Sequence, residues 1–334
     1  MTVKFLKAGR GDSILIQDSK CNILIDGGND SKYLLTEMDK IHSKNGKIDL
    51  VIVTHHDDDH IVGIIDLFKE IKDNRFGERN DFVKRIIFNS ELNITAKPDK
   101  QDDRLLSYKK TKILEKLIKE LSVPWSEKTT KDSASIKLNT ISIQFLSPTI
   151  EALDRYVVRY GDRLSNSGYG DWNKSFNALK QHIDDESQDK SPANESSIVI
   201  SVTDDKKSFL LTGDVTPKRF SVILDEIIIA PNKKAKFDYI KLPHHGSKRS
   251  ISSEILNKID CNNFIISTNG RKHYHPNKKA LLKILTNHNF KKSTTHFYFN
   301  YTEVIESLNV QHKELISNRC VFHKNNHSYG YCFE

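Results

Sequence analysis

Short apolar runs separated by polar turns recur along most of the chain. Runs of this length, bounded by Gly, Asp and Asn, are typical of strands. One strand is predicted before Gly9, and the others are predicted at 13–16, 22–25, 48–53, 86–89, 136–138, 141–146, 198–202, 209–214, 237–242 and 263–267.

Longer segments with apolar residues three and four positions apart lie between these strands and predict helices. They stand at 33–44, 61–72, 105–121, 220–229 and 277–287. Because strands and helices alternate in both halves of the chain, the sequence predicts a mixed α/β fold. Lysines occupy the polar face of 105–121, which is either a solvated surface or a face that contacts phosphates.

The alternation fails between residues 149 and 193. Stretches 153–160 and 172–183 fit helices, whereas 184–192 is polar and is predicted to be an exposed linker. We interpret 149–193 as an insertion into a single domain that spans 1–334. It is either a surface excursion or a wall of the substrate site. The tail, 290–334, is expected to add closing strands.

Three imidazoles and three carboxylates stand together at 54–60, directly after the apolar run 50–53. So many ionisable groups in one loop would repel each other without a bound counter-charge. Imidazole and carboxylate are ligands of zinc, manganese and iron, so a bound dication would remove the conflict. The alternative is a charged loop in contact with solvent.

Two further strand ends, both in the second half, carry residues of the same kind. The predicted strand 209–214 ends in Asp214, and strand 237–242 is followed by His244 and His245. Each strand end is modest evidence by itself. Together with the loop at 54–60 they predict a metal site assembled from distant parts of the chain.

The loop at 54–60 resembles the metal-binding motif of the metallo-β-lactamase superfamily. The usual motif is His-x-His-x-Asp-His, and this chain has His55-x-Asp57-x-Asp59-His60. This variant resembles the soluble C-terminal domain of ComEC-type competence proteins and their free-standing relatives. The resemblance extends to Gly-x-Gly-Asp at 9–12, Asp-Gly-Gly at 26–28, Leu-Leu-Thr-Gly-Asp at 210–214 and Pro-His-His-Gly-Ser at 243–247. It implies an αββα sandwich, in which two mixed sheets are flanked by helices.

The resemblance also implies two divalent cations and assigns their ligands by position. One cation would be held by His55 and Asp57, the other by Asp59, His60 and His245, with Asp214 bridging both. Asp59 also counts among the expected catalytic residues, and the aspartate of Asp-Gly-Gly would support the ligands. A pair of this kind activates a hydroxide as the nucleophile.

The first cation lacks the third histidine that many superfamily members supply before the bridging aspartate. Only His182, inside the expected insertion, and Asn194 are available there. Because Asp57 also replaces a histidine, the ligands are rich in oxygen. Oxygen ligands favour Mn²⁺, with Zn²⁺ and Mg²⁺ as alternatives.

Several other polar residues are candidates for contacts with the substrate. His244 and His275, the latter in a His-Pro pair that the family shares, are expected to be catalytic residues that face the pocket. They would bind a phosphate or protonate a leaving group, and the alternative for each is a structural histidine. Asn194, Lys248 and Arg249 are expected to bind substrate, and a solvated role is the alternative for the two cations.

Composition narrows the class of substrate. The 334 residues carry a net charge of +8, with 44 acidic residues offsetting 52 basic ones. This balance mildly favours a polyanion such as nucleic acid. No apolar run approaches the roughly 20 residues that cross a bilayer, and no signal-peptide core is visible. Four scattered cysteines are typical of a cytoplasmic protein with reduced thiols.

Taken together, the sequence favours a metal-dependent phosphodiesterase or nuclease acting on DNA. One alternative is hydrolysis of a small phosphoester or nucleotide signal, and another is a metal-binding recognition subunit without turnover. β-Lactam or thioester hydrolysis is disfavoured because Asp57 replaces a zinc-binding histidine. A cytoplasmic nuclease would need restraint, so a regulatory protein partner and a role in defence are further hypotheses.

Overall fold

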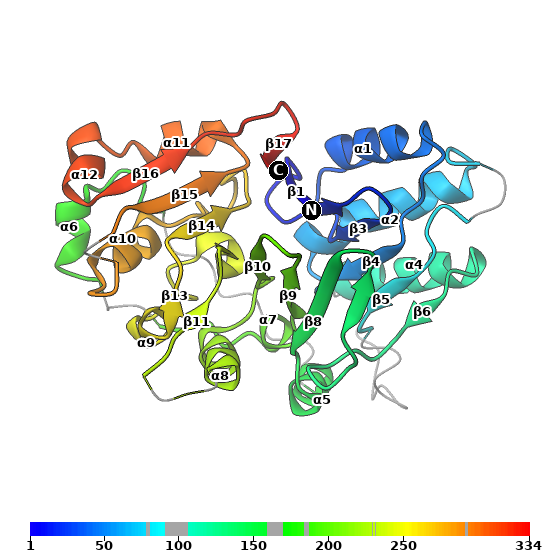
Figure 1. Ribbon diagram of the computed structural model, residues 1–334, viewed down its shortest axis with the longest axis horizontal. Coiled ribbons are helices and arrows are strands. Elements are labelled where there is room, and N and C mark those ends of the chain that lie inside the picture. The colour runs from blue at the N-terminus through cyan, green and yellow to red at the C-terminus, as the bar shows by residue number, and fades with distance from the viewer. Residues whose placement is uncertain are drawn as a thin grey trace.

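The computed structural model describes residues 1–77, 81–90, 106–158, 170–183, 187–228, 230, 232–290 and 293–334. Two large sheets make up its centre, and helices cover the outer face of each (Figure 1). The predicted fold class, two mixed sheets flanked by helices, is confirmed.

The first sheet is built mainly from the first half of the chain and has seven strands. In spatial order they are β17 (Gly330–Phe333), β1 (Thr2–Leu6), β2 (Ile14–Gln17), β3 (Asn22–Ile25), β4 (Leu50–Val53), β5 (Ile86–Phe88) and β6 (Trp125–Ser126). Pairing is antiparallel from β17 to β3 and parallel from β3 to β6.

The second sheet has eight strands. In spatial order they are β16 (Cys320–His323), β15 (Thr295–Phe299), β14 (Asn263–Ile266), β12 (Tyr239–Lys241), β10 (Ser208–Leu211), β9 (Val199–Thr203), β8 (Ile141–Ser147) and β7 (Ile136–Leu138). Pairing is parallel from β16 to β10 and antiparallel from β10 to β7. A separate pair joins β11 (Ala235–Lys236) to β13 (Ile259–Asp260).

The helices divide between the two outer faces. Those over the first sheet are α1 (Lys32–His42), α2 (Asp58–Lys72) and α4 (Leu106–Glu120), at the right of Figure 1. Those over the second sheet are α8 (Pro217–Ile227), α9 (Ser253–Asn257), α10 (Lys278–Thr286) and α11 (Thr302–Leu308). The remaining short ones are α5 (Ile150–Val158), α6 (Phe176–Lys180), α7 (Pro192–Glu195), α12 (His312–Ser317) and the 3-10 turn η1 (Pro243–Gly246).

Three buried clusters hold these layers together, and the strands supply them by alternation. In β4, Val51 and Val53 pack towards the helices, whereas Leu50 and Ile52 pack towards the second sheet. Successive side chains of a strand point to opposite faces, so a strand covered on both sides must be apolar throughout. This explains why β4 is a continuous apolar run.

The tail and the insertion are placed by contacts that periodicity does not reveal. The tail supplies closing strands to both sheets, β15 and β16 to the second and β17 to the first. In the insertion, the Asp171 carboxylate accepts bonds from the backbone N–H groups of Lys278 and Lys279 at 2.8 and 2.9 Å. The expectation that 184–192 is an exposed linker is wrong at Asp189, which is buried.

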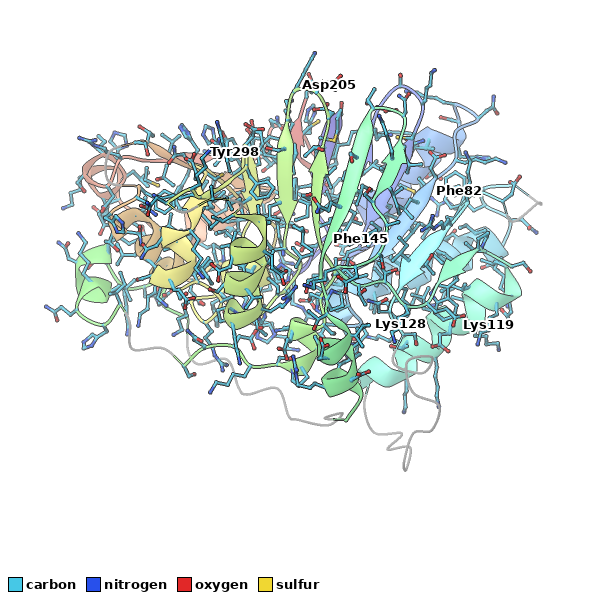
Figure 2. The ribbon with its side chains drawn as sticks, turned by 60° about the horizontal axis from the view of Figure 1, so that its bottom comes forward. Phe82, Lys119, Lys128, Phe145, Asp205 and Tyr298 are labelled. Atoms are coloured by element: carbon cyan, nitrogen blue, oxygen red, sulfur yellow. The ribbon has the colours of Figure 1, made fainter. Side chains whose placement is uncertain are left out.

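Side chains fill the interior of the sandwich (Figure 2). Asp205, at the turn between β9 and β10, marks one end of the strands, and β10 runs from this turn towards Asp214 at the other end. None of the described helices has the length and apolar character needed to cross a membrane.

Candidate metal centre

The ligand-type residues lie where strands of both sheets end. β4 ends at Val53, β10 at Leu211 and β12 at Lys241. Because parallel strands deliver their carboxyl ends to one edge of a sheet, the residues that follow these strands meet at one edge of the sandwich. The structure thereby brings 54–60, Asp214 and 244–245 together.

Asp26, directly after β3, organises the first loop. Its Oδ1 accepts a bond from the Thr54 backbone N–H, and its Oδ2 accepts one from the Thr54 hydroxyl, both at 2.7 Å. Oδ2 also lies 2.7 Å from Nδ1 of His60. A carboxylate at Nδ1 holds the proton on that nitrogen, so Nε2 presents its lone pair to the opposite side.

A close approach of two glycines fixes the start of α2 against the end of β3. A Cβ on Gly63 would lie 2.0 Å from the carbonyl oxygen of Gly27. The Gly27 backbone N–H also donates to the carbonyl of His60 at 2.8 Å. The helix can therefore reach the strand only because no side chain separates the two backbones.

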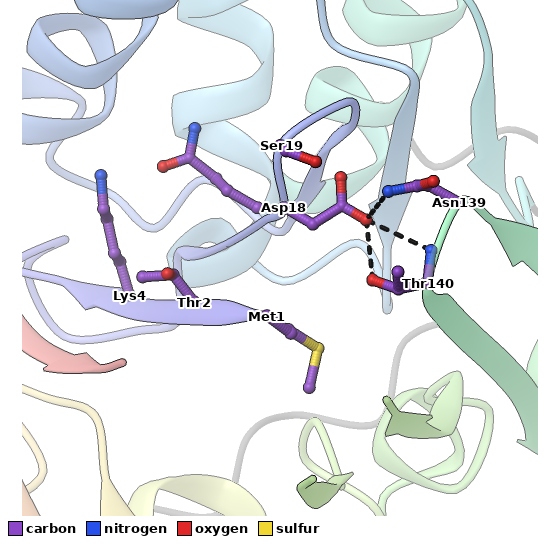
Figure 3. A pocket seen from close by; sticks show the side chains of 8 residues that line it. Met1, Thr2, Lys4, Asp18, Ser19, Asn139 and Thr140 are labelled. Carbon is purple, nitrogen blue, oxygen red and sulfur yellow. Dashed lines mark hydrogen bonds between the residues drawn. The ribbon is translucent and has the colours of Figure 1, made fainter. Parts of the chain in front are cut away.

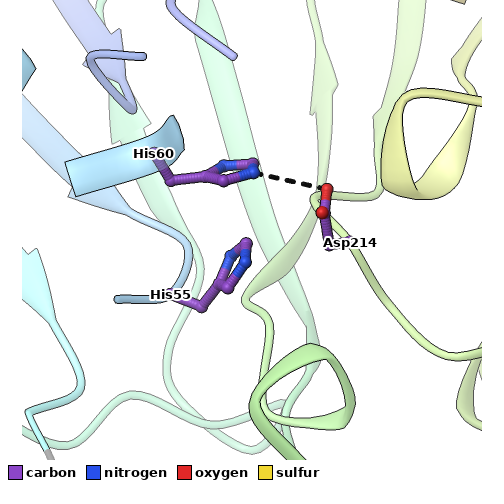
Figure 4. Close-up of side chains that lie close together, drawn as sticks. All are labelled: His55, His60 and Asp214. Atoms are coloured by element: carbon purple, nitrogen blue, oxygen red, sulfur yellow. Dashed lines mark ion pairs between the residues drawn. The ribbon is translucent and has the colours of Figure 1, made fainter. Parts of the chain in front are cut away.

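One set of possible ligand atoms comes from His55, His60 and Asp214, whose atoms all lie within 4.8 Å of one another (Figure 4). Nε2 of His60 lies 3.4 Å from Oδ1 of Asp214. Asp57 joins this set at its edge, with Oδ2 3.7 Å from Nε2 of His55. Although Asp57 is the N-cap of α2, its side chain makes no capping bond and turns to the histidines instead.

A second set comes from Asp59, His60 and His245, again within 4.8 Å of one another. Nε2 of His245 lies 3.7 Å from Oδ2 of Asp59 and 3.5 Å from Oδ2 of Asp214. Its other nitrogen, Nδ1, lies 2.9 Å from the carbonyl oxygen of Ser267 and donates to it. This bond turns Nε2 towards the carboxylates.

The chemistry and burial of these atoms fit a divalent cation. Nε2 of His55, His60 and His245 and Oδ1 of Asp214 are buried and lack a hydrogen-bond partner in the described part of the chain. Burial alone would raise the pKa of Asp214, but His245, His244 and His60 outweigh it and hold that pKa well below its usual range. Buried polar atoms without partners are costly, and a cation between them would remove that cost.

Lys241 and Asp12 lie behind the ligands and were missed by the sequence analysis. Lys241 is fully buried, and its Nζ lies 2.5 Å from Oδ2 of Asp12 and 3.6 Å from Oδ1 of Asp214. It also donates to the carbonyl of Gly213 at 2.9 Å. The available signals were a lysine at the end of an apolar strand and the aspartate of Gly-x-Gly-Asp.

His244 lies beside the ligands, held by a residue of the insertion. Its Nε2 is 3.7 Å from Oδ2 of Asp214, and its Nδ1 is 3.1 Å from Oδ2 of Asp189. Asn194 donates to the same Asp189 oxygen at 2.7 Å. The sequence analysis missed Asp189, which stands in a polar segment without periodicity. Part of 149–193 therefore forms a wall of this site.

His275 faces the same region. Its ring centre is 5.3 Å from that of His244, and its buried Nδ1 has no hydrogen-bond partner among the described residues. Burial, followed by the neighbouring His244 and His245, holds its pKa well below the usual range. His275 is therefore a neutral imidazole at pH 7.

Lys248 and Arg249 contact neighbouring protein groups, and their expected role in substrate binding stays a prediction. Arg249 donates through Nε to the carbonyl of Ser187 at 3.1 Å, which holds the segment that leads to Asp189. The Lys248 backbone N–H donates to Asn277 at 2.9 Å. His182 belongs to none of the ligand sets found in the described ranges. His56 contacts the Tyr156 hydroxyl.

A separate hollow lies at the opposite ends of the strands. It is lined by Met1, Thr2, Lys4, Gln17, Asp18, Ser19, Asn139 and Thr140 (Figure 3). Asp18 already accepts bonds from Asn139 and Thr140 there. The hollow holds no histidine and is remote from the ligand sets, so we do not place the active site in it.

Comparison with known families agrees with the ligand geometry. Residues 6–108, which include the loop at 54–60, match the family described as the Metallo-beta-lactamase superfamily. The matched stretch is similar to that superfamily, and the ligand sets described above fit divalent cations.

Among individual proteins, the chain is 30% identical to ComE operon protein 3 of Bacillus subtilis over 106 residues, which is 32% of this chain and 13% of that protein. Among solved structures, YhfI of Bacillus subtilis has a TM-score of 0.42 and 13% identity, covering 100% of this chain and 99% of that one. Zn²⁺-bound PqqB of Methylobacterium extorquens has a TM-score of 0.44 and 11% identity, with 100% of each chain covered.

Proposed function

We propose that this protein is a metal-dependent phosphodiesterase that cleaves DNA. The observation that carries the proposal is the convergence of four buried, unpartnered ligand atoms from His55, His60, His245 and Asp214. Asp57 and Asp59 add carboxylates at the open side of this group, where their side chains are 30% and 20% exposed. The resemblance of the motifs to those of ComEC-type competence proteins and the net charge of +8 support a nucleic-acid substrate.

Each group of the chain has a distinct task in this proposal. Bound divalent cations would supply an activated water and neutralise charge on the phosphoryl oxygens. Asp26 and the Ser267 carbonyl hold His60 and His245 in the orientation that cation binding needs. Lys241 offsets the charge of the buried Asp12 and Asp214.

The two remaining histidines are placed to bind the substrate. Asp189 holds Nδ1 of His244, so its Nε2 faces the side where Asp214 lies. Neutral His275 offers Nδ1 without competition from a protein partner in the described segments. A phosphate oxygen or the leaving oxygen between the two rings would receive hydrogen bonds from both.

The metal is proposed to be Mn²⁺. Three carboxylates, Asp57, Asp59 and Asp214, face the ligand sets alongside three histidines, and oxygen-rich sites favour harder cations than zinc. Elemental analysis of protein purified without chelators should give about two manganese ions per chain. A tight pair of zinc ions would contradict this assignment.

Activity is best tested with a matched pair of aspartates from one loop. Wild type, Asp59→Ala and Asp58→Ala should be assayed with Mn²⁺ on DNA, RNA, nucleotides and bis(p-nitrophenyl) phosphate. Asp58 is the control because its carboxylate is 2.6 Å from Nζ of Lys110 on α4, away from the ligands. We expect the wild type and Asp58→Ala to cut DNA, and Asp59→Ala to lose at least about a hundredfold in rate.

The same assay separates the alternatives. Equal DNA cleavage by Asp59→Ala and the wild type would overturn the assignment of the site. Hydrolysis of a nucleotide without cleavage of DNA would favour a small phosphoester as substrate. Bound metal without turnover of any substrate would favour a recognition subunit.

A further inference from the structure

A second hollow, of about 550 Å³, opens beside the metal centre. It is lined by residues of 9–10, 29–31 and 269–272 together with Asp66. Three of these residues are the cations Arg10, Arg271 and Lys272. The hollow is polar and open, which suits a charged ligand rather than an apolar one.

This hollow is joined directly to the ligand loop. A Cβ on Gly11 would lie 1.6 Å from the backbone carbonyl oxygen of Asp59, so the backbone next to Arg10 touches that of a ligand residue. The Arg10 backbone N–H donates to Oδ1 of Asn29 at 2.8 Å. The carbonyl of Gly9 accepts a bond from the Asn269 backbone N–H at 2.8 Å. These bonds hold two walls of the hollow against the metal centre.

The charges of the three cations are not neutralised by neighbouring carboxylates. Within the described ranges, neither Arg10, Arg271 nor Lys272 forms an ion pair, and the buried Nε of Arg10 has no hydrogen-bond partner. A buried guanidinium nitrogen without an acceptor is costly, and an anion in the hollow would supply the missing acceptor.

The two carboxylates of the hollow are already engaged. Asp66 accepts a bond from the Ser31 hydroxyl at 2.9 Å and lies 3.7 Å from Nζ of Lys69. Asp30 accepts a bond from the backbone N–H of Lys32 at 3.1 Å. Each of these carboxylates therefore has a partner other than the three cations of the hollow.

His273 connects the hollow with the histidines beside the metal centre. It directly follows Lys272 in the chain, and its ring centre lies 6.0 Å from that of His275. The basic hollow and the side of the centre that His275 faces are therefore lined by one continuous segment.

We propose that Arg10, Arg271 and Lys272 form a second phosphate subsite, which holds a phosphate neighbouring the one that is cleaved. Guanidinium groups match phosphate oxygens in a planar, two-pronged geometry. This inference rests on the proposed phosphodiesterase function and extends it, because the subsite selects oligonucleotides over substrates that have one phosphate.

Binding is tested in the Asp59→Ala background, so that the substrate survives the measurement. Fluorescence anisotropy with a labelled single-stranded oligonucleotide should compare Arg10→Gln and Arg271→Gln/Lys272→Gln with Lys206→Gln/Lys207→Gln. The control pair lies at the turn between β9 and β10, at the far end of the strands. We expect each hollow variant to weaken binding about tenfold. The slope of log Kd against log salt concentration should also fall by about 0.7 for each phosphate that the variant no longer binds.

The proposed subsite would be overturned if both hollow variants bound the oligonucleotide as tightly as the Lys206→Gln/Lys207→Gln control does. Kinetics in the wild-type background add an independent test. There KM for the oligonucleotide should rise about tenfold more than KM for bis(p-nitrophenyl) phosphate. If the wild type cleaves neither substrate, the proposed function fails, and the binding experiment still decides whether the hollow holds phosphate. If the wild type cleaves the oligonucleotide but the hollow variants raise both KM values by the same factor, the subsite proposal fails and the proposed function stands.

Discussion

At the scale of single residues, three of the ligands are held by a further contact on the side away from the proposed cations. Asp26 lies behind His60 and the Ser267 carbonyl behind His245. Lys241 lies behind Asp214. The partners of the histidines determine which ring nitrogen faces the cation, and the partner of Asp214 favours its charged form. The identity of a ligand residue alone does not determine either property.

Replacing Asp26 tests this arrangement. In Asp26→Ala the His60 ring loses its acceptor, so we expect metal affinity to fall about 10- to 100-fold. A competition titration with a metal-binding dye measures the affinity. Asp30→Ala is the matched control on the same loop. Unchanged affinity in Asp26→Ala would show that His60 is oriented by other contacts.

Lys241 offers a second test, read out as stability. Lys241→Met removes the cation from between Asp12 and Asp214 and leaves a buried carboxylate unpaired. The free energy of unfolding in chelator should fall by about 3–5 kcal/mol. Adding Asp12→Asn removes that charge and should recover part of the loss. Denaturant titration of both variants checks this, and equal stability of the single and double variants would contradict it.

At the scale of elements, salt bridges tie helices to strands at the outer edge of the first sheet. Glu37 of α1 is buried, and its carboxylate oxygens lie 2.8 Å from Nζ of Lys4 on β1 and 2.6 Å from Nζ of Lys40. Burial raises the pKa of Glu37, but the bonds to both lysines outweigh it, and the net pKa is lowered.

Because the two ion pairs lower the pKa of Glu37, they make the free energy of unfolding depend on pH. A carboxyl with a lowered pKa in the folded state stabilises the protein above its unfolded pKa of about 4.5, and the effect is lost as pH falls through the folded value. Glu37→Gln should therefore cost about 2 kcal/mol at pH 7. The difference from wild type should shrink below about pH 4.5. Urea titrations at pH 7 and pH 4 check this, and a constant difference would contradict it.

Elements with strong patterns were predictable from the sequence, and those fixed by distant contacts were not. The strand β4 is apolar on both faces and was readily identified, as was the ligand loop that follows it. Asp189 lies in a polar segment, and only its approach to His244 gives it a role. Lys241 is interpretable only once Asp12 is beside it. Such pairings join residues far apart in sequence, so they cannot be predicted from the local pattern of apolar and polar residues.

At the scale of the whole molecule, the centre joins the two halves of the sandwich. Its ligands follow β4 in the first sheet and β10 and β12 in the second. Asp59, which follows the first of these strands, and Asp214, which follows the second, both approach Nε2 of His245, at 3.7 and 3.5 Å. Bound cations should therefore stabilise the sandwich as a unit and not one loop.

Metal removal tests this coupling. A ligand at 100 times its Kd stabilises the folded state by about 2.7 kcal/mol, so a chelator should lower Tm by several degrees. Differential scanning fluorimetry measures the shift, and Mn²⁺ in excess should reverse it. The Asp59→Ala variant should respond less than Asp58→Ala. An unchanged Tm in wild type would argue against cations bound between the halves.

The pairing of β1 with β17 has a consequence for engineering. Because these neighbouring strands bring Met1 and Glu334 to adjacent places (Figure 1), a short flexible linker would span the distance between them, although it would remove the ion pair between the Met1 amine and Asp204. The protein reopened at the turn beside Lys206 would be a circular permutant, with its ligand residues rearranged in sequence but not in space. Retained metal affinity in that permutant would show that the three-dimensional arrangement, and not the order of the strands along the chain, defines the centre.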